Sequence, residues 1–274
     1  MTSIFHNIGK KISANFLTVG LNLSNNGSIC MMRGNKILFY LESERITRKK
    51  YDTVVRDLLQ YVDKKPHAIG IADCYWDAGS KTVLSSRDIA AVKRLFPKSK
   101  LYDYRGCHHL VHAASGLYNS GFKDGIAVVV DGNGSKTKEG IEIETVYDVP
   151  TFKVLHKKYF SQEDIGIGKK FEQACVNYGF AKEDAGKIMG LAATDDHEAK
   201  YVQELWESVA LDLAQYGKGR NLILTGGCFL NCKVNYYIRQ NVPLDQKMYV
   251  EPVAHDGGTA IGAAYLAQIR HTGH

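Results

Sequence analysis

Apolar runs broken by turn residues open the chain and predict a β-sheet. The segment FLTVGLNLSNNGSICMMRGNKILFYLESER is interrupted at NNGS and at RGNK, which predicts three antiparallel strands. The pattern then predicts a helix near 51–63, a strand in HAIGIADC, a helix near 86–95, a short strand KLYDY, a helix opening near CHHLVHAASGLY and a strand GIAVVVDGNG. The predicted order of this part is therefore β-β-β-α-β-α-β-α-β.

A second run of strands partly repeats this order. Strands IEIETVYDV and TFKVLHKKYF are followed by predicted helices near 166–178, 184–193 and 198–216. A strand NLILTGG, a helix from about 229, a strand MYVEP and a final helix after HDGG close the chain. Two sheet-opened halves predict an α/β fold of two ribonuclease H-like lobes, 1–145 and 146–274, which face across a cleft as in the actin-like and sugar-kinase-like ATPases.

Composition narrows the class of protein. With 274 residues, 45% of them hydrophobic, the chain can bury a full core, and no segment approaches the length of a membrane span. A cytoplasmic protein without membrane contact is expected, and its six scattered cysteines are expected to be reduced thiols. The formal charge of +6 favours an anionic partner, or simply a solvated basic surface.

The segment HHLVHAAS contains a histidine pair with metal-ligand spacing. His108 and His112 are four residues apart, which on a helix places them one turn apart on one face. Neutral imidazoles fixed on one helix can share a transition metal. Packing of a buried helix face produces the same spacing, so the pair alone leaves both interpretations open.

Two aspartates stand beside glycines at the ends of predicted elements. Asp131 ends the strand GIAVVVDGNG, and Asp256 precedes the glycine pair of HDGGTAIGAAY. A carboxylate at a strand tip, where the backbone can approach closely, suits a metal or a phosphate-bound metal. The alternatives are an Asx turn for Asp131 and a helix N-cap for Asp256.

Two further glycine-rich segments could bind phosphate. TGGCFLN joins a strand to a helix through Gly226 and Gly227, and backbone N–H groups at a helix start favour an anion, although a simple bend would use the same residues. GKIMGLAA supplies Lys187, which could instead be a solvated lysine on a packed helix.

Six segments, taken in order, resemble the carbamoyltransferase family that includes antibiotic-tailoring (tobramycin), nodulation-factor and cephamycin enzymes. ESERITRKKYD resembles its EER-x-x-R-x-K-H/Y-D segment, CHHLVHAASGLYNSGF its HHLAHAAS segment, VVVDGNG its strand-end aspartate and AGKIMGLAA its GKVMGLAA segment. NLILTGGCFLNCKVN resembles its GG-x-x-LN-x-x-xN segment, and VEPVAHDGGTAIGAA its P-x-x-x-D-x-G-x-A-x-GAA segment. The similarity covers nearly the whole chain and corresponds to the family's amino-terminal, metal-binding transferase domain.

The resemblance implies an O-carbamoyltransferase with a metal site. Carried over, the metal ligands are His108, His112, Asp131 and Asp256. Iron is the implied metal, and manganese or zinc would also accept this set of donors. The implied donor is carbamoyl-adenylate, made from carbamoyl phosphate and ATP, whose carbamoyl group passes to an acceptor hydroxyl.

The resemblance also assigns roles to the remaining candidates. Those expected to contact the anhydride or its phosphate are Arg45, Lys49 and Lys187. Those expected to line the nucleotide pocket are Gly226, Gly227 and Asn231. His109 is a candidate general base, with a metal-bound water or the departing phosphate as alternatives, or a merely structural role.

The chain departs from the family in two ways. Family members usually continue into a domain that makes carbamoyl-adenylate, so this activating domain is expected to be absent. Either a separate protein then supplies carbamoyl-adenylate, or this form uses carbamoyl phosphate and nucleotide by itself. Asn25 and Asn26 replace the usual His-Asp of the opening hairpin, which puts a donor contact there in doubt.

No motif identifies the acceptor substrate, so the hypothesis about it rests on the positive charge and small size of the chain. The leading hypothesis is 5-hydroxymethylcytosine in DNA, and the alternative is a hydroxyl of a small sugar or antibiotic. The same fold could also serve a different class of protein, a metal-dependent nucleotide hydrolase or an ATP-binding regulatory subunit.

Overall fold

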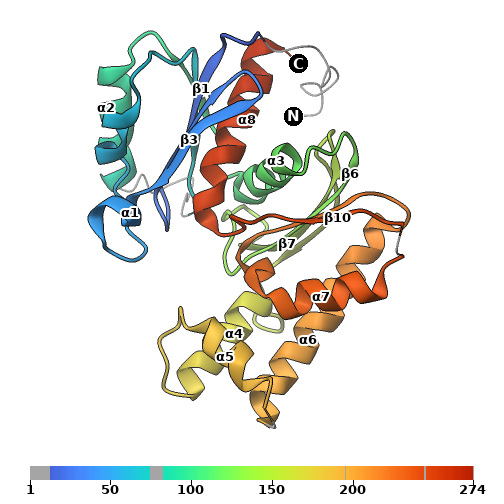
Figure 1. Cartoon of the computed structure of the whole chain (residues 1–274). Coiled ribbons are helices and arrows are strands. Elements are labelled where there is room, and N and C mark those ends of the chain that lie inside the picture. Colours follow the sequence, from blue (N-terminus) through green and yellow to red (C-terminus); the bar gives the residue numbers. More distant parts are fainter. Residues whose placement is uncertain (1–12, 75–82, 195, 244, 274) are drawn as a thin grey trace.

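The computed structural model describes residues 13–74, 83–194, 196–243 and 245–273, which form two five-stranded sheets with helices on both faces (Figure 1). The strands are β1 Leu17–Asn22, β2 Ser28–Arg33, β3 Lys36–Glu42, β4 Ala68–Ala72, β5 Lys100–Asp103, β6 Gly125–Val130, β7 Glu142–Val149, β8 Lys153–Tyr159, β9 Leu222–Thr225 and β10 Met248–Val250. The α-helices are α1 Ser43–Thr47, α2 Val83–Leu95, α3 His108–Ser120, α4 Ile167–Asn177, α5 Ala185–Leu191, α6 His197–Ala214, α7 Cys232–Asn241 and α8 Thr259–Thr272. Short 3-10 helices are η1 Arg56–Tyr61, η2 Gln215–Gly217, η3 Gly227–Leu230 and η4 Asp256–Gly258.

The two sheets share one strand order. The first runs β3-β2-β1-β4-β5, and the second, read from its own hairpin edge, runs β8-β7-β6-β9-β10. In each sheet three antiparallel strands are followed by two parallel ones. This confirms both the hairpin sheet predicted at the start of the chain and the repeat of its pattern. Because β6 and β9 are neighbouring parallel strands, the residues that follow them lie close together at the carboxyl-terminal end of both strands.

Helices α3 and α8 form a layer between the two sheets (Figure 1). α8 packs on β1, β2 and β4 of the first sheet and on α3, and α3 packs on β6, β7 and β9 of the second sheet. One apolar cluster therefore joins residues of both sheets, such as Ala68 and Val129, through the two helices. η1 and α2 cover the outer face of the first sheet, and α4 to α7 cover that of the second.

Glycines let α8 approach its neighbours closely. A Cβ at Gly20 of β1 would lie 1.8 Å from the carbonyl oxygen of Ala260, and one at Gly70 of β4 would lie 2.1 Å from that of Ala263. On the opposite side, a Cβ at Gly262 would lie 1.9 Å from the carbonyl oxygen of Val111 on α3. Backbone packed against backbone leaves little freedom for α8 to shift.

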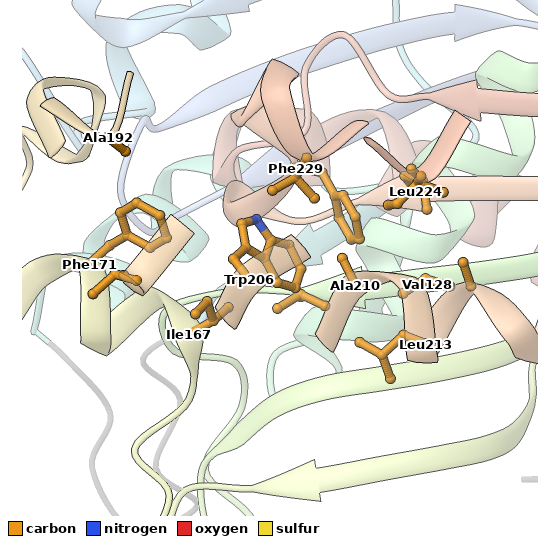
Figure 2. Packing of buried hydrophobic residues seen from close by; sticks show 14 of the residues in the cluster. Val128, Ile167, Phe171, Ala192, Trp206, Ala210, Leu213, Leu224 and Phe229 are labelled. Carbon is orange, nitrogen blue, oxygen red and sulfur yellow. The ribbon is translucent and has the colours of Figure 1, made fainter. Parts of the chain in front are cut away.

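The outer core of the second sheet is built around Trp206 of α6 (Figure 2). Its ring lies 5.2 Å from that of Phe229, and its indole N–H donates to the carbonyl of Cys228 at 3.2 Å. Val128 of β6 and Leu224 of β9 contribute from the second sheet. The turn that follows β9 is therefore fixed from behind by a fully buried aromatic residue.

The sheets divide the chain earlier than the lobe boundary expected after residue 145. β6 pairs with β7 and β9 in the second sheet, whereas the carboxyl-terminal helix α8 packs on the first. A boundary drawn by sheet membership lies between β5 and β6 and leaves α8 with the first sheet. The pattern of the sequence shows where strands occur but not which strands they pair with, so sheet membership had to come from the structure.

Two predicted helices differ in detail. The segment near 51–63 forms only the short 3-10 helix η1, anchored beneath the first sheet by Leu58 and Leu59. The helix expected from about 229 begins as η3, and α7 starts at Cys232 because the side chain of Asn231 accepts from the N–H of Val234 at 3.2 Å.

All six cysteines are free thiols, as expected. No helix in the described part of the chain combines the length and the apolar character needed to cross a bilayer.

Candidate metal centre

Four side chains that are far apart in the sequence converge between the sheets. Each offers one ligand atom, and these atoms all lie within 4.8 Å of one another. Asp131 Oδ2 lies 3.1 Å from His108 Nε2 and 3.3 Å from His112 Nε2. Asp256 Oδ1 lies 3.4 Å and 3.9 Å from the same two nitrogens. The four residues are those for which a shared metal was expected.

Each ligand candidate is held by a different part of the fold. His108 and His112 project from the first turn and a half of α3, whose start is fixed by donation from the His108 N–H to Ser135 Oγ at 2.8 Å. Asp131 follows β6, and its Oδ1 accepts from the N–H of Gly132 at 2.7 Å. Asp256 opens η4, and its Oδ2 accepts from Ser24 Oγ at 3.4 Å. The bond to the N–H of Gly132 leaves the second oxygen of Asp131, Oδ2, directed at the histidines.

The electrostatics of this cluster favour positive charge. Burial lowers the pKa of His108, but the carboxylates of Asp256 and Asp131 outweigh it and raise that pKa to about 10. Burial raises the pKa of Asp131, yet hydrogen bonds to His108 and His112 hold it well below its usual range. A site that stabilises a proton between two carboxylates also stabilises a cation there.

The donor set fits a divalent transition metal. The Nε2 atoms of His108 and His112 lie only 3.1 Å apart, with both rings fully buried. Across the described residues, the ion-pair partners of the two carboxylates are these histidines and no lysine or arginine. Two imidazoles and two carboxylates that face one another without a cationic side chain are a set that iron, manganese or zinc accepts.

The glycine turn predicted to bind phosphate lies directly beside Asp131. A Cβ at Gly227 would lie 3.1 Å from Asp131 Oδ1. Gly226 has a φ of +94° and packs against β6, so that a Cβ there would lie 2.3 Å from the carbonyl oxygen of Val130. Only glycine fits this backbone without strain. Asn231 lies just beyond, but its side chain is engaged by Val234 and by Gln203, whose Oε1 accepts from Asn231 Nδ2 at 2.8 Å.

His109 faces away from the four-residue cluster. Its Nδ1 lies 2.7 Å from Thr145 Oγ1 on β7, and its Nε2 is buried without a hydrogen-bond partner in the described part of the chain. Burial, together with the neighbouring His108, holds the pKa of His109 well below its usual range. The ring is therefore neutral at neutral pH, but it is fully buried against the second sheet.

The three predicted basic residues lie outside the cluster. Arg45 on α1 is exposed and pairs with Glu44 Oε1 at 3.4 Å and Glu42 Oε2 at 3.9 Å. Lys49 is exposed just beyond α1. Lys187 on α5 pairs with Asp184 at 2.7 Å and lies over the ring of Phe180. Arg45 connects to the centre indirectly, because Glu42 also contacts the residue before Asp256.

That residue is His255, which sequence reasoning did not single out. His255 Nε2 lies 3.4 Å from Glu42 Oε1, which also accepts from the hydroxyl of Tyr40 at 2.7 Å. His255 Nδ1 accepts from the N–H of Gly257 at 3.1 Å. These contacts tie the Asp256 turn to the end of β3. The one sequence signal for this contact was Glu42, a carboxylate at the end of a predicted strand within the ESER segment, for which a histidine is a natural partner.

The start of α4 presses on the turn after Asp131. A Cβ at Gly168 would lie 2.6 Å from the Cα of Gly132. The next residue, Lys169, binds both carboxylate oxygens of Glu172, at 2.9 and 2.7 Å. The segment IGIGKKFEQ therefore packs against the turn that follows Asp131 and carries an ion pair next to it.

A separate cavity of 420 Å³ lies at the other end of the second sheet. Its lining includes Asp124, Asn221 and Lys247, which precede β6, β9 and β10. None of the four clustered residues lines it, and no feature of the cavity connects it with their chemistry.

Solved structures define the class of fold. HypF from T. kodakarensis superimposes with a TM-score of 0.61 at 12% identity, covering 98% of this chain and 50% of that one. The ROK hexokinase from Thermus thermophilus gives 0.57 at 14% identity, covering 93% and 100%. At such identities the likeness concerns the fold alone, and it confirms the two-lobed α/β architecture of the sugar-kinase-like ATPases.

Sequence comparisons then point to the family. Residues 211–265, which include Asp256 and the glycine turn, match the family "Carbamoyltransferase N-terminus". Nodulation protein U of Azorhizobium caulinodans is 39% identical over 71 residues, 25% of this chain and 12% of that protein. Nodulation protein NolNO of Sinorhizobium fredii is 21% identical over 327 aligned positions, 93% of this chain and 48% of that protein. Part of the chain, residues 211–265, is thus similar to the carbamoyltransferase amino-terminal domain, and the chain spans about half the length of NolNO.

Proposed function

We propose that this chain is the transferase domain of an O-carbamoyltransferase that moves a carbamoyl group from carbamoyl-adenylate to a hydroxyl. The observation that carries the proposal is the convergence of His108, His112, Asp131 and Asp256 beside the Gly226 turn. The family match over 211–265 covers two parts of that arrangement. Carbamoyl phosphate and ATP are the proposed precursors of the donor.

The four clustered residues would hold a divalent cation, iron in the first place, which would supply Lewis-acid stabilisation of the donor phosphate. The Gly226–Gly227 turn would receive the nucleotide phosphate at its backbone N–H groups. Arg45, Lys49 and Lys187 would approach the anhydride from the exposed side, where Arg45 and Lys187 are already ordered by carboxylates. Asn231 would act through the shape of the turn, since its own polar atoms are engaged.

The transfer step exchanges one acyl bond for another. The acceptor oxygen forms a bond to the carbamoyl carbon, the bond from that carbon to the phosphate oxygen breaks, and AMP leaves with the electron pair. The acceptor proton must pass to a base. His109 is the proposed base among the side chains, because its ring is neutral and its Nε2 lacks a partner in the described structure. Its ring faces Thr145 rather than the four clustered residues, so the departing phosphate is the alternative base.

The proposed acceptor is a hydroxymethylated pyrimidine in DNA, 5-hydroxymethylcytosine. The support for a polyanion is the formal charge of +6. A hydroxyl of a small sugar or antibiotic is the alternative. Transfer to DNA should weaken steeply as salt is raised, whereas transfer to a neutral sugar should not. Salt-insensitive transfer to a sugar, with none to modified DNA, would decide for the alternative.

The test is an acceptor panel read by mass spectrometry. One arm supplies carbamoyl phosphate, ATP and Fe²⁺ or Mn²⁺, and the other supplies preformed carbamoyl-adenylate, so that the need for a separate activating protein shows as activity in the second arm alone. The expected result is a carbamoyl mass increment on an acceptor, lost in His112→Ala. Nucleotide release without a carbamoylated product, as AMP or ADP from ATP in the first arm and as AMP in the second, would establish a hydrolase instead.

A further inference from the structure

Glu251 is a buried carboxylate at the point where the chain crosses from the second sheet to the first. It follows β10, and its backbone N–H extends the ladder by donating to the carbonyl of Leu224 at 2.9 Å. Five residues later the chain reaches Asp256 and then α8, which packs on the first sheet. Glu251 therefore begins the loop that delivers one of the four clustered side chains.

The side chain of Glu251 is held by the helix that carries the two histidines. Asn119 Nδ2 on α3 lies 3.0 Å from each carboxylate oxygen, and the N–H of Val253 donates to Oε1 at 3.2 Å. Only 1% of Glu251 is exposed. Neither of these partners is cationic, and a carboxylate buried in this way costs folding free energy.

Asn119 and His112 lie on the same side of α3. They are seven residues apart, which is close to two full turns. Burial raises the pKa of Glu251, while Asn119, the Val253 N–H and the His112 imidazole act in the opposite direction. His112 Nδ1 is itself buried without a hydrogen-bond partner in the described structure. The carboxylate of Glu251 is therefore bound on the side of α3 that also carries His112.

We propose that Glu251 and Asn119 form a positioning pair for the metal centre. The pair holds the loop that carries Asp256 against α3, the helix that carries both histidines. This inference rests on the proposed function, because it requires a cation at the four clustered residues. Glu251 acts through His112 and Asp256 rather than by contact with donor or acceptor.

An isosteric exchange tests the pair. Glu251→Gln removes the charge and Asn119→Asp removes the amide donor, whereas the double variant places the amide at 251 and the carboxylate at 119 with no change in shape. The readouts are the dissociation constant for Mn²⁺, measured on the full chain by competition with a chelator, and thermal unfolding of the metal-free protein. Each single variant should weaken Mn²⁺ binding by about 10- to 100-fold, and the double variant should recover most of that loss.

The control is a buried carboxylate elsewhere. Asp88 is 6% exposed and lies on α2, across the first sheet from α8 (Figure 1). Asp88→Asn should leave Mn²⁺ affinity unchanged, even where it changes stability. Equal losses in Asp88→Asn and Glu251→Gln would show a general effect of burial and overturn the proposal.

Each other result of the Mn²⁺-binding and folding measurements also supports or overturns the proposal. Wild-type affinity in Glu251→Gln, or a folded double variant that binds as weakly as the singles, would overturn the positioning role. If a single variant does not fold, the double decides, because recovery of both folding and Mn²⁺ affinity supports the pair. A wild-type chain that binds no Mn²⁺ would refute the metal centre and this inference together. Metal binding that follows the pattern above in a chain without carbamoyl transfer would refute only the proposed reaction.

Discussion

Gly262 of α8 lies against the backbone of Val111 on α3, so closely that a Cβ at position 262 would come within 1.9 Å of the Val111 carbonyl oxygen. Val111 immediately precedes His112, and α8 begins just after Asp256. This helix crossing therefore sets the distance between the histidine-bearing helix and the turn that carries Asp256. The same α8 is pressed from the other side by Gly20 and Gly70.

Gly262→Ala should separate α8 from α3. The added methyl group meets backbone, which cannot rotate away, so a loss of about 1–3 kcal/mol in unfolding free energy is expected, together with weaker metal binding. Denaturant unfolding and metal titration measure the two effects. Gly186→Ala is the control, because Gly186 on α5 has open space around it and alanine should stabilise that helix by about 0.5–1 kcal/mol. Equal stability of Gly262→Ala and wild type would contradict the tight crossing.

Removal of one clustered carboxylate should abolish stabilisation by metal. In the wild type, Mn²⁺ at about 100 times its dissociation constant should raise the unfolding free energy by about 2.7 kcal/mol. Asp256→Asn removes a charged ligand, so the thermal shift on addition of Mn²⁺ should disappear while the metal-free protein stays folded. A full metal-dependent shift in Asp256→Asn would show that the ion binds elsewhere.

The metal-free protein should lose stability as pH rises between about 6.5 and 10. The pKa of His108 is raised from 6.5 to about 10 in the folded state, so its contribution is fully present below 6.5 and is lost as pH rises through 10. Unfolding free energies measured across this range for wild type and His108→Gln should converge toward the alkaline end. Added metal should bind more tightly as pH rises, because it needs the deprotonated imidazole. A difference in unfolding free energy between wild type and His108→Gln that does not change with pH would contradict the raised pKa of His108.

Arg45→Ala should affect the donor and not the fold. The side chain is 67% exposed, so its ion pairs with Glu42 and Glu44 contribute little to stability. A guanidinium that contacts the donor phosphate should raise KM for the donor by about tenfold or more, with kcat largely kept. Arg56→Ala is the matched control, because Arg56 is also exposed and pairs with Asp57 at 3.8 Å. An unchanged KM would remove Arg45 from the proposed donor site.

Asn231→Ala should act on stability. Loss of the α7 cap should lower the unfolding free energy by about 1 kcal/mol, and loss of the bond to Gln203 adds to this. Asp196 caps α6, because its Oδ1 accepts from the N–H of Ala199 at 3.0 Å. Asp196→Ala should therefore lower the unfolding free energy by a similar amount. Nucleotide affinity measured well below the unfolding transition shows whether Asn231 also contacts the ligand; a large loss of affinity with unchanged stability would contradict the cap as its main role.

Much of the fold was predictable because its signals are local. Alternating and continuous apolar runs located all ten strands of the described residues, and the repeat of those runs revealed two similar sheets. The boundary between the sheets was not predictable, because hydrogen bonding assigns β6 to the second sheet and close packing returns α8 to the first. Ladder partners and helix contacts depend on segments far away in the sequence.

The sequence by itself determined that His108 and His112 share one helix face, that Asp131 ends a strand and that Gly226 and Gly227 form the turn after another, because each follows from the geometry of a single element. Only the tertiary structure decided that Asp131 and Asp256 meet those histidines, that His109 turns to Thr145 and that Glu251 is bound by Asn119. These contacts arise where α3 and α8 are packed between two sheets, and that packing fixes distances between residues that no local pattern relates.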